Sequence, residues 1–460
     1  GIRDTSVTGV QTCALPIFDA VATPSADDEL ERETSQLLHR PSVAAATWAL
    51  FLGLGLVMIG NGLNGSLLGV RSEAAGFDLS ITGVIMAAYF VGFLVGTTYA
   101  ERALKSVGHI RVFAALASLA SSVVLVQAIS ISPITWMMTR FLFGACMAGI
   151  YVVVESWLND LATNATRGRI LSVYMIVSMG GVGAGQLLLN VNDNSGFTLF
   201  IVASVLVSLS LVPVALSASS TPPLVVPETM KLAPLLRRAP TGVMSSFFSG
   251  AGAGALISMS AVYASQVGMP AGRLSLFVTA PMIGALLFQL PIGVLSDKFP
   301  RRGIMFGVAA AAATSPLVAL AVGEQSMVAV LAMGLIGGAM FPFYSLGIAY
   351  TNDWLKAEEI LGASGTLVRV NGSGAIGGPL LAGGLMAAFG PRMFFWSITS
   401  IFSVIGIYIL TRIVSKDALP KERQRRYVPF PARASSVAAN LIPRRRRNEQ
   451  GVPSGQPLNQ

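Results

Sequence analysis

The feature that most constrains the fold of this chain is a series of twelve long apolar runs. An α-helix needs about 20 apolar residues to cross the ~30 Å hydrocarbon core of a bilayer, and each run is about that long. The runs are continuous and do not alternate between apolar and polar residues, which excludes a membrane β-barrel. The sequence therefore predicts an all-α polytopic membrane protein with twelve transmembrane helices. The runs fall at 43–66, 79–99, 111–130, 134–157, 170–190, 197–217, 241–264, 274–295, 303–322, 326–350, 362–388 and 393–413.

The composition of the chain excludes the main soluble classes. Only 12% of the 460 residues are charged, whereas soluble domains carry about 25%. The mean hydropathy is +0.67, so a soluble fold would leave much apolar surface in contact with water. The net charge of +9 comes largely from loops and the C-terminal end, which is typical of membrane topology and not of a nucleic-acid-binding domain.

The distribution of lysine and arginine predicts the orientation of the helices. Cytoplasmic loops of membrane proteins carry an excess of these residues. With both termini placed in the cytoplasm, the outer loops hold only Arg71, Arg273 and Arg392. The inner loops hold a larger set, which is Arg102, Lys105, Arg111, Arg167, Arg169, Lys231, Arg237, Arg238, Lys298, Arg301, Arg302 and Lys356. We therefore expect a multi-pass protein of the bacterial inner membrane with both termini in the cytoplasm.

Polar segments divide the chain into five parts. These are an N-terminal arm (1–42), a six-helix bundle (43–217), a Pro-rich cytoplasmic linker (218–240), a second six-helix bundle (241–413) and a basic cytoplasmic tail (414–460). Residues 1–18 resemble translated sequencing-adapter read-through, and we expect no structural role for them. Arg444 to Arg447 in the tail are expected to hold the C-terminus at anionic lipid of the cytoplasmic leaflet.

The two bundles are related by an internal repeat. A shift of 193 residues superposes Asn159-Asp160 on Asn352-Asp353 and Tyr151 on Tyr344. The same shift places Gly144 on Gly337 and Gly185 on Gly378, and a shift of 192 places Gly92 on Gly284. Each copy spans six helices, so both copies have the same orientation in the membrane. This predicts parallel repeats related by an axis along the membrane normal.

A short motif between the eighth and ninth runs resembles a family signature. The segment Gly293-Val-Leu-Ser-Asp297-Lys298-Phe-Pro-Arg301-Arg302 is similar to the loop signature of the major facilitator superfamily, G-x-x-x-D-[RK]-x-G-R-[RK], with Pro300 replacing the second glycine. The resemblance implies two six-helix bundles that move about a central cavity. It also implies that Gly293, Asp297, Lys298, Arg301 and Arg302 form a conformational latch, which biases a two-state equilibrium.

Further segments resemble the uncharacterised YcaD-type branch of that superfamily. They are Tyr151-Val-Val-Val-Glu155-Ser156, Arg167-Gly168-Arg169, Tyr174-Met175 and Gly185-Gln186-Leu187-Leu188. The corresponding loop of the first half departs from the signature, since Lys105 stands where the aspartate would be. We therefore expect only the second half to carry an acidic latch residue.

Three ionisable residues inside the predicted spans are candidates for function. A charge at the bilayer centre costs about 2.5–3.5 kcal/mol on insertion scales, so such residues are functional candidates by default. They are Arg140 and Glu155 in the fourth run and Arg369 in the eleventh. In the resembled superfamily, the first, second, fourth, fifth, seventh, eighth, tenth and eleventh helices line the cavity. All three residues therefore fall on cavity helices.

Each of these three residues has a structural alternative. Arg140, Gly144, Met147, Tyr151 and Glu155 form one helical stripe, which we expect to face the cavity. Arg140 could instead lie at the membrane interface. The only carboxylate in the spans, Glu155, is the candidate proton carrier, or it forms a structural pair with Arg167 or Arg169. Arg369 is a candidate for binding an anionic substrate group or pairing with Glu155, or it stabilises a gate.

Neutral polar residues on the same helices complete the set of substrate or coupling candidates. They are Asn61, Asn64, Tyr89, Tyr151, Gln186, Tyr344 and Asn371. Each could equally form a hydrogen bond between helices.

These features favour transport over catalysis. His39 and His109 lie outside the predicted spans, so no metal or cofactor site is expected inside the membrane, and the chain lacks a phosphate-binding G-x-x-x-x-G-K-[ST] segment. The resemblance implies a monomeric secondary active transporter for small solutes, with alternating access. We predict proton coupling and favour efflux; the alternatives are an uptake symporter for a metabolite and a membrane receptor or scaffold. The expected partners are a small-molecule substrate, a coupling proton and lipid, with no nucleic acid.

Overall fold

The computed structural model describes residues 43–163, 165–191, 196–216, 230–323, 326–356, 358–415, 424–425 and 427–430. The predicted N-terminal arm 1–42, with residues 1–18, lies outside this part of the chain. So do residues 217–229 of the linker region and the stretch with Arg444 to Arg447.

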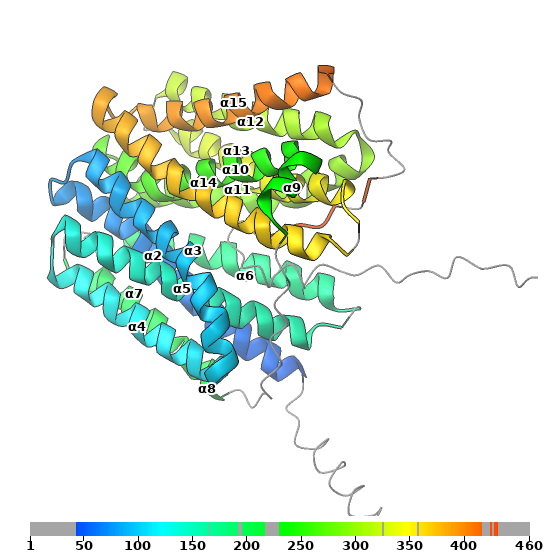
Figure 1. Ribbon diagram of the computed structural model, residues 1–460. Helices are drawn as coiled ribbons and strands as arrows, with labels where there is room; N and C mark the ends of the chain where they lie inside the picture. The colour runs from blue at the N-terminus through cyan, green and yellow to red at the C-terminus, as the bar shows by residue number, and fades with distance from the viewer. Residues whose placement is uncertain are drawn as a thin grey trace, which may run out of the picture.

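The first half of the molecule contains six membrane-length helical segments, which appear blue to green in Figure 1. They are α2 (Val43–Ala74), α3 (Leu79–Val107), α4 (His109–Ile129), α5 (Pro133–Leu161), α6 (Arg167–Leu187) with the short helix η1 (Leu188–Asn190), and α7 (Thr198–Leu209) with α8 (Leu211–Leu216). The break between α7 and α8 has a local cause. Pro213 lacks an N–H group and its ring crowds the carbonyl of Leu209, four residues earlier.

The second half begins with the short helix α9 (Leu232–Arg238) and continues with six long helices. They are α10 (Pro240–Gln266), α11 (Ala271–Lys298), α12 (Arg301–Val322), α13 (Met327–Asp353), α14 (Ile360–Phe389) and α15 (Met393–Ser415). Twelve helical segments of the described chain are therefore long and apolar enough to cross a membrane, which confirms the predicted fold class.

Several helices extend beyond the apolar runs that predict them. Helix α3 continues to Val107 and includes Glu101 and Lys105, where the sequence analysis placed a loop. Polar side chains at such helix ends can reach water, so the apolar run marks the membrane core and not the helix end. The connection to α4 shrinks to Gly108, whose φ of 86° is a conformation that favours glycine.

The internal repeat recurs in the backbone contacts of the two halves. A Cβ built on Gly92 of α3 would lie 1.8 Å from the Phe141 carbonyl oxygen of α5. The equivalent Gly284 of α11 would meet the Gly334 carbonyl oxygen of α13 at the same 1.8 Å. Two helices of each half therefore approach at matching positions that exclude side chains. This confirms that the halves are structural repeats.

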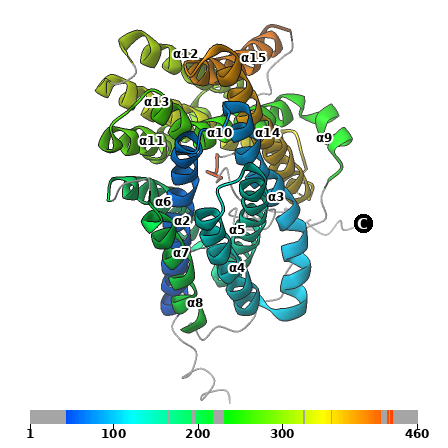
Figure 2. The same cartoon turned by 90° about the vertical axis from the view of Figure 1, so that its left-hand side faces the viewer.

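The two halves are joined mainly at one end of the molecule. We call the end where α2 begins and α15 ends the basic end, and the other the opposite end. At the opposite end, Ser265 Oγ of α10 donates to Glu73 Oε2 of α2 at 2.9 Å. Asn190 Nδ2 donates to Ser275 Oγ of α11 at 2.5 Å. Seen from this end in Figure 2, α2 and α3 lie beside α10 and α14.

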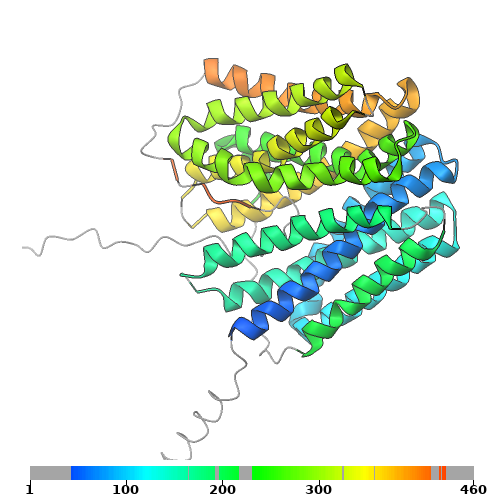
Figure 3. The same ribbon diagram turned by 180° about the vertical axis from the view of Figure 1, so that it is seen from behind.

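Part of the predicted tail packs inside the second half. The sequence analysis placed residues 414–460 outside the bundles, but α15 ends at Ser415 and the segment 424–430 returns to the helices. Tyr427 is 8% and Phe430 1% exposed. Figure 3 shows this orange-red segment as an extended piece of chain beside the yellow and green helices.

Candidate functional site

A pocket lies between the two halves, where α3 faces α14 next to α10. Its wall extends from Tyr89 near the middle of α3 to Glu101 nearer the basic end. On the other side it is lined by α14, including Arg369 and Asn371. The pocket therefore combines a mostly apolar wall with one cation and one carboxylate, the composition of a small-molecule site.

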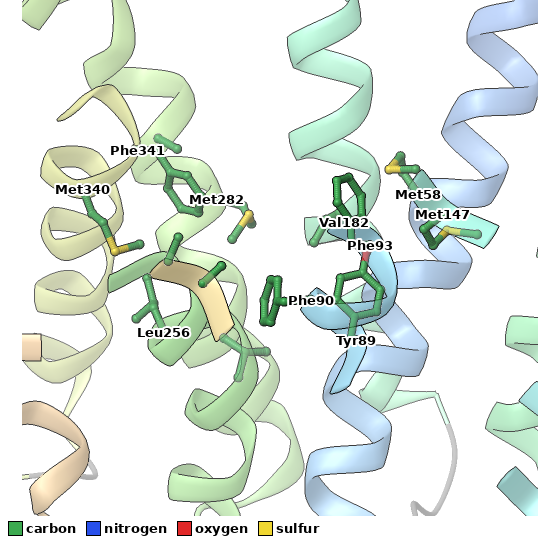
Figure 4. Packing of buried hydrophobic residues seen from close by; sticks show 14 of the residues in the cluster. Met58, Tyr89, Phe90, Phe93, Met147, Val182, Leu256, Met282, Met340 and Phe341 are labelled. Atoms are coloured by element: carbon green, nitrogen blue, oxygen red, sulfur yellow. The ribbon is translucent and has the colours of Figure 1, made fainter. Parts of the chain in front are cut away.

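The α3 wall of the pocket is a single helical stripe. Tyr89, Phe93, Thr97 and Glu101 follow one another at intervals of four residues, so they share one face of the helix. Phe90 lies beside this stripe, and Figure 4 shows its ring in the space between the two groups of helices. The spacing of four residues, which predicts a common helix face, can be read from the sequence. Glu101 was missed because it follows the apolar run at 79–99.

The predicted candidate Arg140 lies in the interior of the first half. Its side chain is buried, with 5% exposed. Its guanidinium Cζ lies 5.6 Å from the centre of the Tyr89 ring, close enough for a cation–π interaction. An Arg140 Nη2 donor lies 3.0 Å from Met86 Sδ and 3.4 Å from the Gly65 carbonyl oxygen. Arg140 thus connects the pocket wall on α3 with α2.

The predicted candidate Glu155 is fully buried near the basic end of α5. The Tyr174 hydroxyl of α6 donates to Glu155 Oε1 at 2.5 Å. Glu155 also interacts electrostatically with Tyr344 of α13, in the other half. The neighbouring Tyr151 donates to Met58 Sδ of α2 at 3.0 Å. The carboxylate therefore lies in a tyrosine-rich site at the junction of the two halves.

The predicted candidates on α14 have different surroundings. Arg369 is exposed and lines the pocket, whereas Asn371 is buried and donates from Nδ2 to the Ser246 carbonyl oxygen at 3.0 Å. In this conformation Arg369 and Glu155 form no ion pair with each other. The structure thus places Arg369 with Tyr89 in the pocket lining, and Glu155 in contact with Tyr174.

The remaining neutral candidates lie in the interior of the first half. Asn61 and Asn64 on α2 are 4% and 0% exposed, and Gln186 on α6 is 2% exposed. Neither polar atom of the Asn64 side chain has a hydrogen-bond partner within the described ranges, and the same holds for Asn61 Nδ2 and Gln186 Oε1. Buried polar groups are normally paired, with protein or with ordered water. These atoms are therefore available to a polar solute or to water.

The predicted latch is built from the end of α11 and the start of α12. Arg301 is 1% exposed and forms an ion pair with Asp353 Oδ2 of α13 at 2.6 Å. Asp297 Oδ1 lies 3.5 Å from Arg301 Nη2, and Arg302 donates to the Tyr350 hydroxyl at 2.9 and 3.0 Å. Asp353 was not among the predicted latch residues, although the Asn352-Asp353 repeat had already marked its position.

The two remaining residues of the latch motif have distinct surroundings. Lys298 is exposed at the end of α11. Gly293 lies against the ring of Tyr427, a residue that the motif does not contain.

In the described part of the chain, no group of three His, Cys, Asp or Glu residues could hold a metal ion.

Comparisons with known proteins agree with this architecture. A profile of the Major Facilitator Superfamily matches residues 50–272 and 242–448. The uncharacterized MFS-type transporter YcaD of Salmonella typhi is 26% identical over 379 residues, which cover 81% of this chain and 96% of that protein. An uncharacterized MFS-type transporter of Yersinia pseudotuberculosis serotype O:3 (strain YPIII) is 26% identical over 340 residues, covering 72% and 86%.

Solved structures share the fold at low sequence identity. The crystal structure of the nucleoside transporter NupG has a TM-score of 0.67 and 13% identity, and the match covers 81% of this chain and 100% of that one. A bacterial homolog of the human lysosomal transporter Spinster, in an inward-facing and unoccupied conformation, has a TM-score of 0.64 and 14% identity, covering 82% and 96%. Because the family profile matches both six-helix halves, the chain belongs to the Major Facilitator Superfamily, a family of membrane transporters and not of enzymes.

Proposed function

We propose that this protein is a proton-coupled secondary active transporter that moves a small organic solute by alternating access. The observation that carries the proposal is the pocket between the halves, because it combines an aromatic wall with Arg369. The contacts between Ser265 and Glu73 and between Asn190 and Ser275 close the opposite end. A solute held in the pocket would cross the membrane when the halves part there and close at the basic end.

We assign binding of the solute to the pocket and proton transfer to Glu155. A carboxylate with 0% exposure in a membrane protein is costly to ionise, so protonation can be linked to a change in its surroundings. Tyr344 belongs to the other half, so rocking of the halves would change its distance from Glu155. Arg369, exposed in the pocket, is assigned to an anionic or electron-rich group of the solute.

For the orientation, we propose a bacterial inner membrane with both termini in the cytoplasm. The basic residues near the basic end support this, because positive loops remain in the cytoplasm. The pocket then faces the cytoplasm, and its mostly apolar wall favours export of an apolar or aromatic compound. Uptake of a metabolite is the alternative. A labelled compound supplied to proteoliposomes of known protein orientation distinguishes the two directions.

The substrate class can be identified by a ligand-stabilisation screen on the purified protein. Compounds that raise the unfolding temperature bind the folded state. The same compounds should lose this effect on Arg369→Ala if they bind in the pocket. A compound that stabilises both proteins equally binds elsewhere.

Glu155→Gln should abolish accumulation of the substrate driven by a pH gradient. Binding and downhill exchange should remain, because glutamine keeps the shape of the side chain but cannot take up or release a proton at working pH. Labelled substrate in proteoliposomes, with and without an imposed pH gradient, measures both activities. Asp160→Asn is the matched control, since Asp160 is an exposed carboxylate on the same helix.

The result for Glu155 should be read together with Arg369. Arg369→Ala should lose binding and exchange together, and the double variant should be no worse than Arg369→Ala alone. If Glu155→Gln still concentrates substrate against its gradient, Glu155 has a structural role through its hydrogen bond with Tyr174.

A reversible cross-link should test alternating access. A Cβ built on Gly69 of α2 would lie 3.3 Å from the Ala261 Cβ of α10, close to the spacing in disulfides. Gly69→Cys with Ala261→Cys should therefore lock the opposite end when oxidised and stop transport. Reduction should restore transport, and each single variant is the control. Full transport by the oxidised double variant would refute rocking at this contact.

A further inference from the structure

The segment of residues 424–425 and 427–430 packs inside the second half, well in from the end of α13. It contacts Ser345 of α13, which is eight residues before the end of that helix, or about 12 Å at 1.5 Å per residue. Non-helical backbone is stable at that depth only where protein or a water-filled cavity surrounds it. The segment therefore needs a dedicated set of partners.

The backbone of the segment finds these partners in the latch. The Arg425 N–H donates to Asp353 Oδ1 at 2.8 Å, and the Arg425 carbonyl oxygen accepts from Arg301 Nη2 at 2.6 Å. The Tyr427 N–H donates to Asp297 Oδ1 at 2.7 Å. Three charged residues that the family motif and the repeat had singled out thus hold the segment in this conformation.

The side chain of Tyr427 occupies space that a glycine leaves open. A Cβ built on Gly293 of α11 would lie 2.4 Å from Tyr427 Cδ1. The Tyr427 hydroxyl accepts from Gln289 Nε2 of the same helix at 2.8 Å. Burial raises the pKa of the Tyr427 hydroxyl, so this group stays neutral. Gly293, the first residue of the latch motif, therefore provides the docking site for the ring.

Phe430 packs against Ser345 and Tyr344 of α13. The Phe430 N–H donates to Ser345 Oγ at 2.9 Å, and the Ser345 hydroxyl donates to the Phe430 carbonyl oxygen at 2.9 Å. Its ring centre lies 6.0 Å from that of Tyr344, the residue that interacts with Glu155 across the halves. Figure 2 shows the orange-red segment between the two groups of helices, and Figure 1 shows it toward the end where α2 begins.

We propose that residues 424–425 and 427–430 belong to an autoinhibitory strap, which docks on the latch and opposes closure of the halves at the basic end. This inference rests on the proposed alternating access. When the strap is docked, Asp297, Arg301 and Asp353 each form a hydrogen bond with a backbone group of the segment. Phe430 then lies beside Tyr344. Closure of the basic end requires the strap to leave, so its contacts stabilise the conformation that is closed at the opposite end.

Two reporters test the strap in the full-length protein without a known substrate. Trypsin cleavage after Arg425 reports docking, because both backbone groups of this residue are bonded when the segment is in place. Opening of the opposite end is reported by Ala261→Cys, in a background in which the two cysteines of the chain, Cys13 and the buried Cys146, are replaced by serine. Ala261 is 1% exposed at the contact between α10 and α2, so a membrane-impermeant maleimide reaches it only when the halves part there.

Two variants release the strap from its two sides. Phe430→Ala removes its anchor, and Gly293→Ala places a methyl group where the Tyr427 ring docks. Each should raise cleavage after Arg425 and labelling at position 261 about fivefold, as expected for the loss of one or two anchoring contacts. Gly303→Ala is the matched control, because a Cβ at Gly303 of α12 meets nothing within 4 Å. It should change neither reporter.

The outcomes separate the strap from the proposed function. Unchanged cleavage in both variants would show that these contacts do not hold the segment. Raised cleavage with unchanged labelling would show a structural anchor that does not control the halves, and would overturn the proposal. Adding Gly293→Ala to a Tyr427→Ala chain should have no further effect, which excludes a general loss of folding. Failure of alternating access itself would appear in the Gly69–Ala261 cross-link, whatever the strap does.

Discussion

Asp353→Asn is expected to destabilise the second half by about 3 kcal/mol, as when one partner of a buried ion pair is removed. Arg301 is 1% exposed, and its partner side chain at position 353 is 3% exposed. The substitution leaves a guanidinium in the protein interior, and within the described ranges the acidic partner that remains is Asp297, at 3.5 Å. Thermal unfolding in detergent measures the loss.

A surface ion pair and a double variant complete this experiment. Arg238 and Glu359 form a salt bridge with side chains 49% and 27% exposed. Glu359→Gln should change stability little, because exposed pairs contribute little. Replacing the buried pair by Arg301→Met with Asp353→Leu should recover much of the loss, since no charge is then left unpaired. If Asp353→Asn unfolds at the wild-type temperature, the pair does not hold α12 against α13.

Gly92→Ala should destabilise the first half by about 3 kcal/mol, the upper part of the usual range for overpacking. The new methyl group would lie 1.8 Å from the Phe141 carbonyl oxygen, so α3 and α5 would have to separate. A backbone oxygen cannot rotate away as a flexible side chain can. The fraction of protein that remains monodisperse after heating, followed by size-exclusion chromatography, measures the effect.

The repeat and a neighbouring helix supply the controls for this substitution. Gly284→Ala should have a comparable effect on α11 and α13, because Gly284 makes the equivalent contact with the Gly334 carbonyl oxygen. Gly180→Ala on α6 should be neutral or slightly stabilising, since nothing lies within 4 Å of a Cβ there and alanine favours helix. Equal stability of Gly92→Ala and Gly180→Ala would mean that α3 and α5 can separate without a loss of folding free energy.

The membrane helices, their number and the repeat could be predicted from the amino-acid pattern alone. These follow from local physics, because an apolar run that crosses a bilayer must satisfy its own backbone groups as a helix. The sequence also identified repeat positions such as Gly92 and Gly284. Two helices can approach closely only where a side chain is missing, so glycine recurs at the same position in each half. The family motif likewise identified Asp297 and Arg301 before any contact was known.

Which of these residues contact one another depends on how the helices pack, and the sequence pattern does not contain that information. Arg369 and Glu155 both lie on predicted cavity helices, yet Arg369 lines the pocket with Tyr89 while Glu155 bonds Tyr174. The return of residues 424–430 to the latch was equally hidden, because a polar, basic segment after the last helix has no periodicity that distinguishes a docked chain from a solvated one. Its position depends on partners more than 70 residues away, such as Asp353 and Asp297. Contacts of that range are decided by how the helices pack, and no local pattern records them.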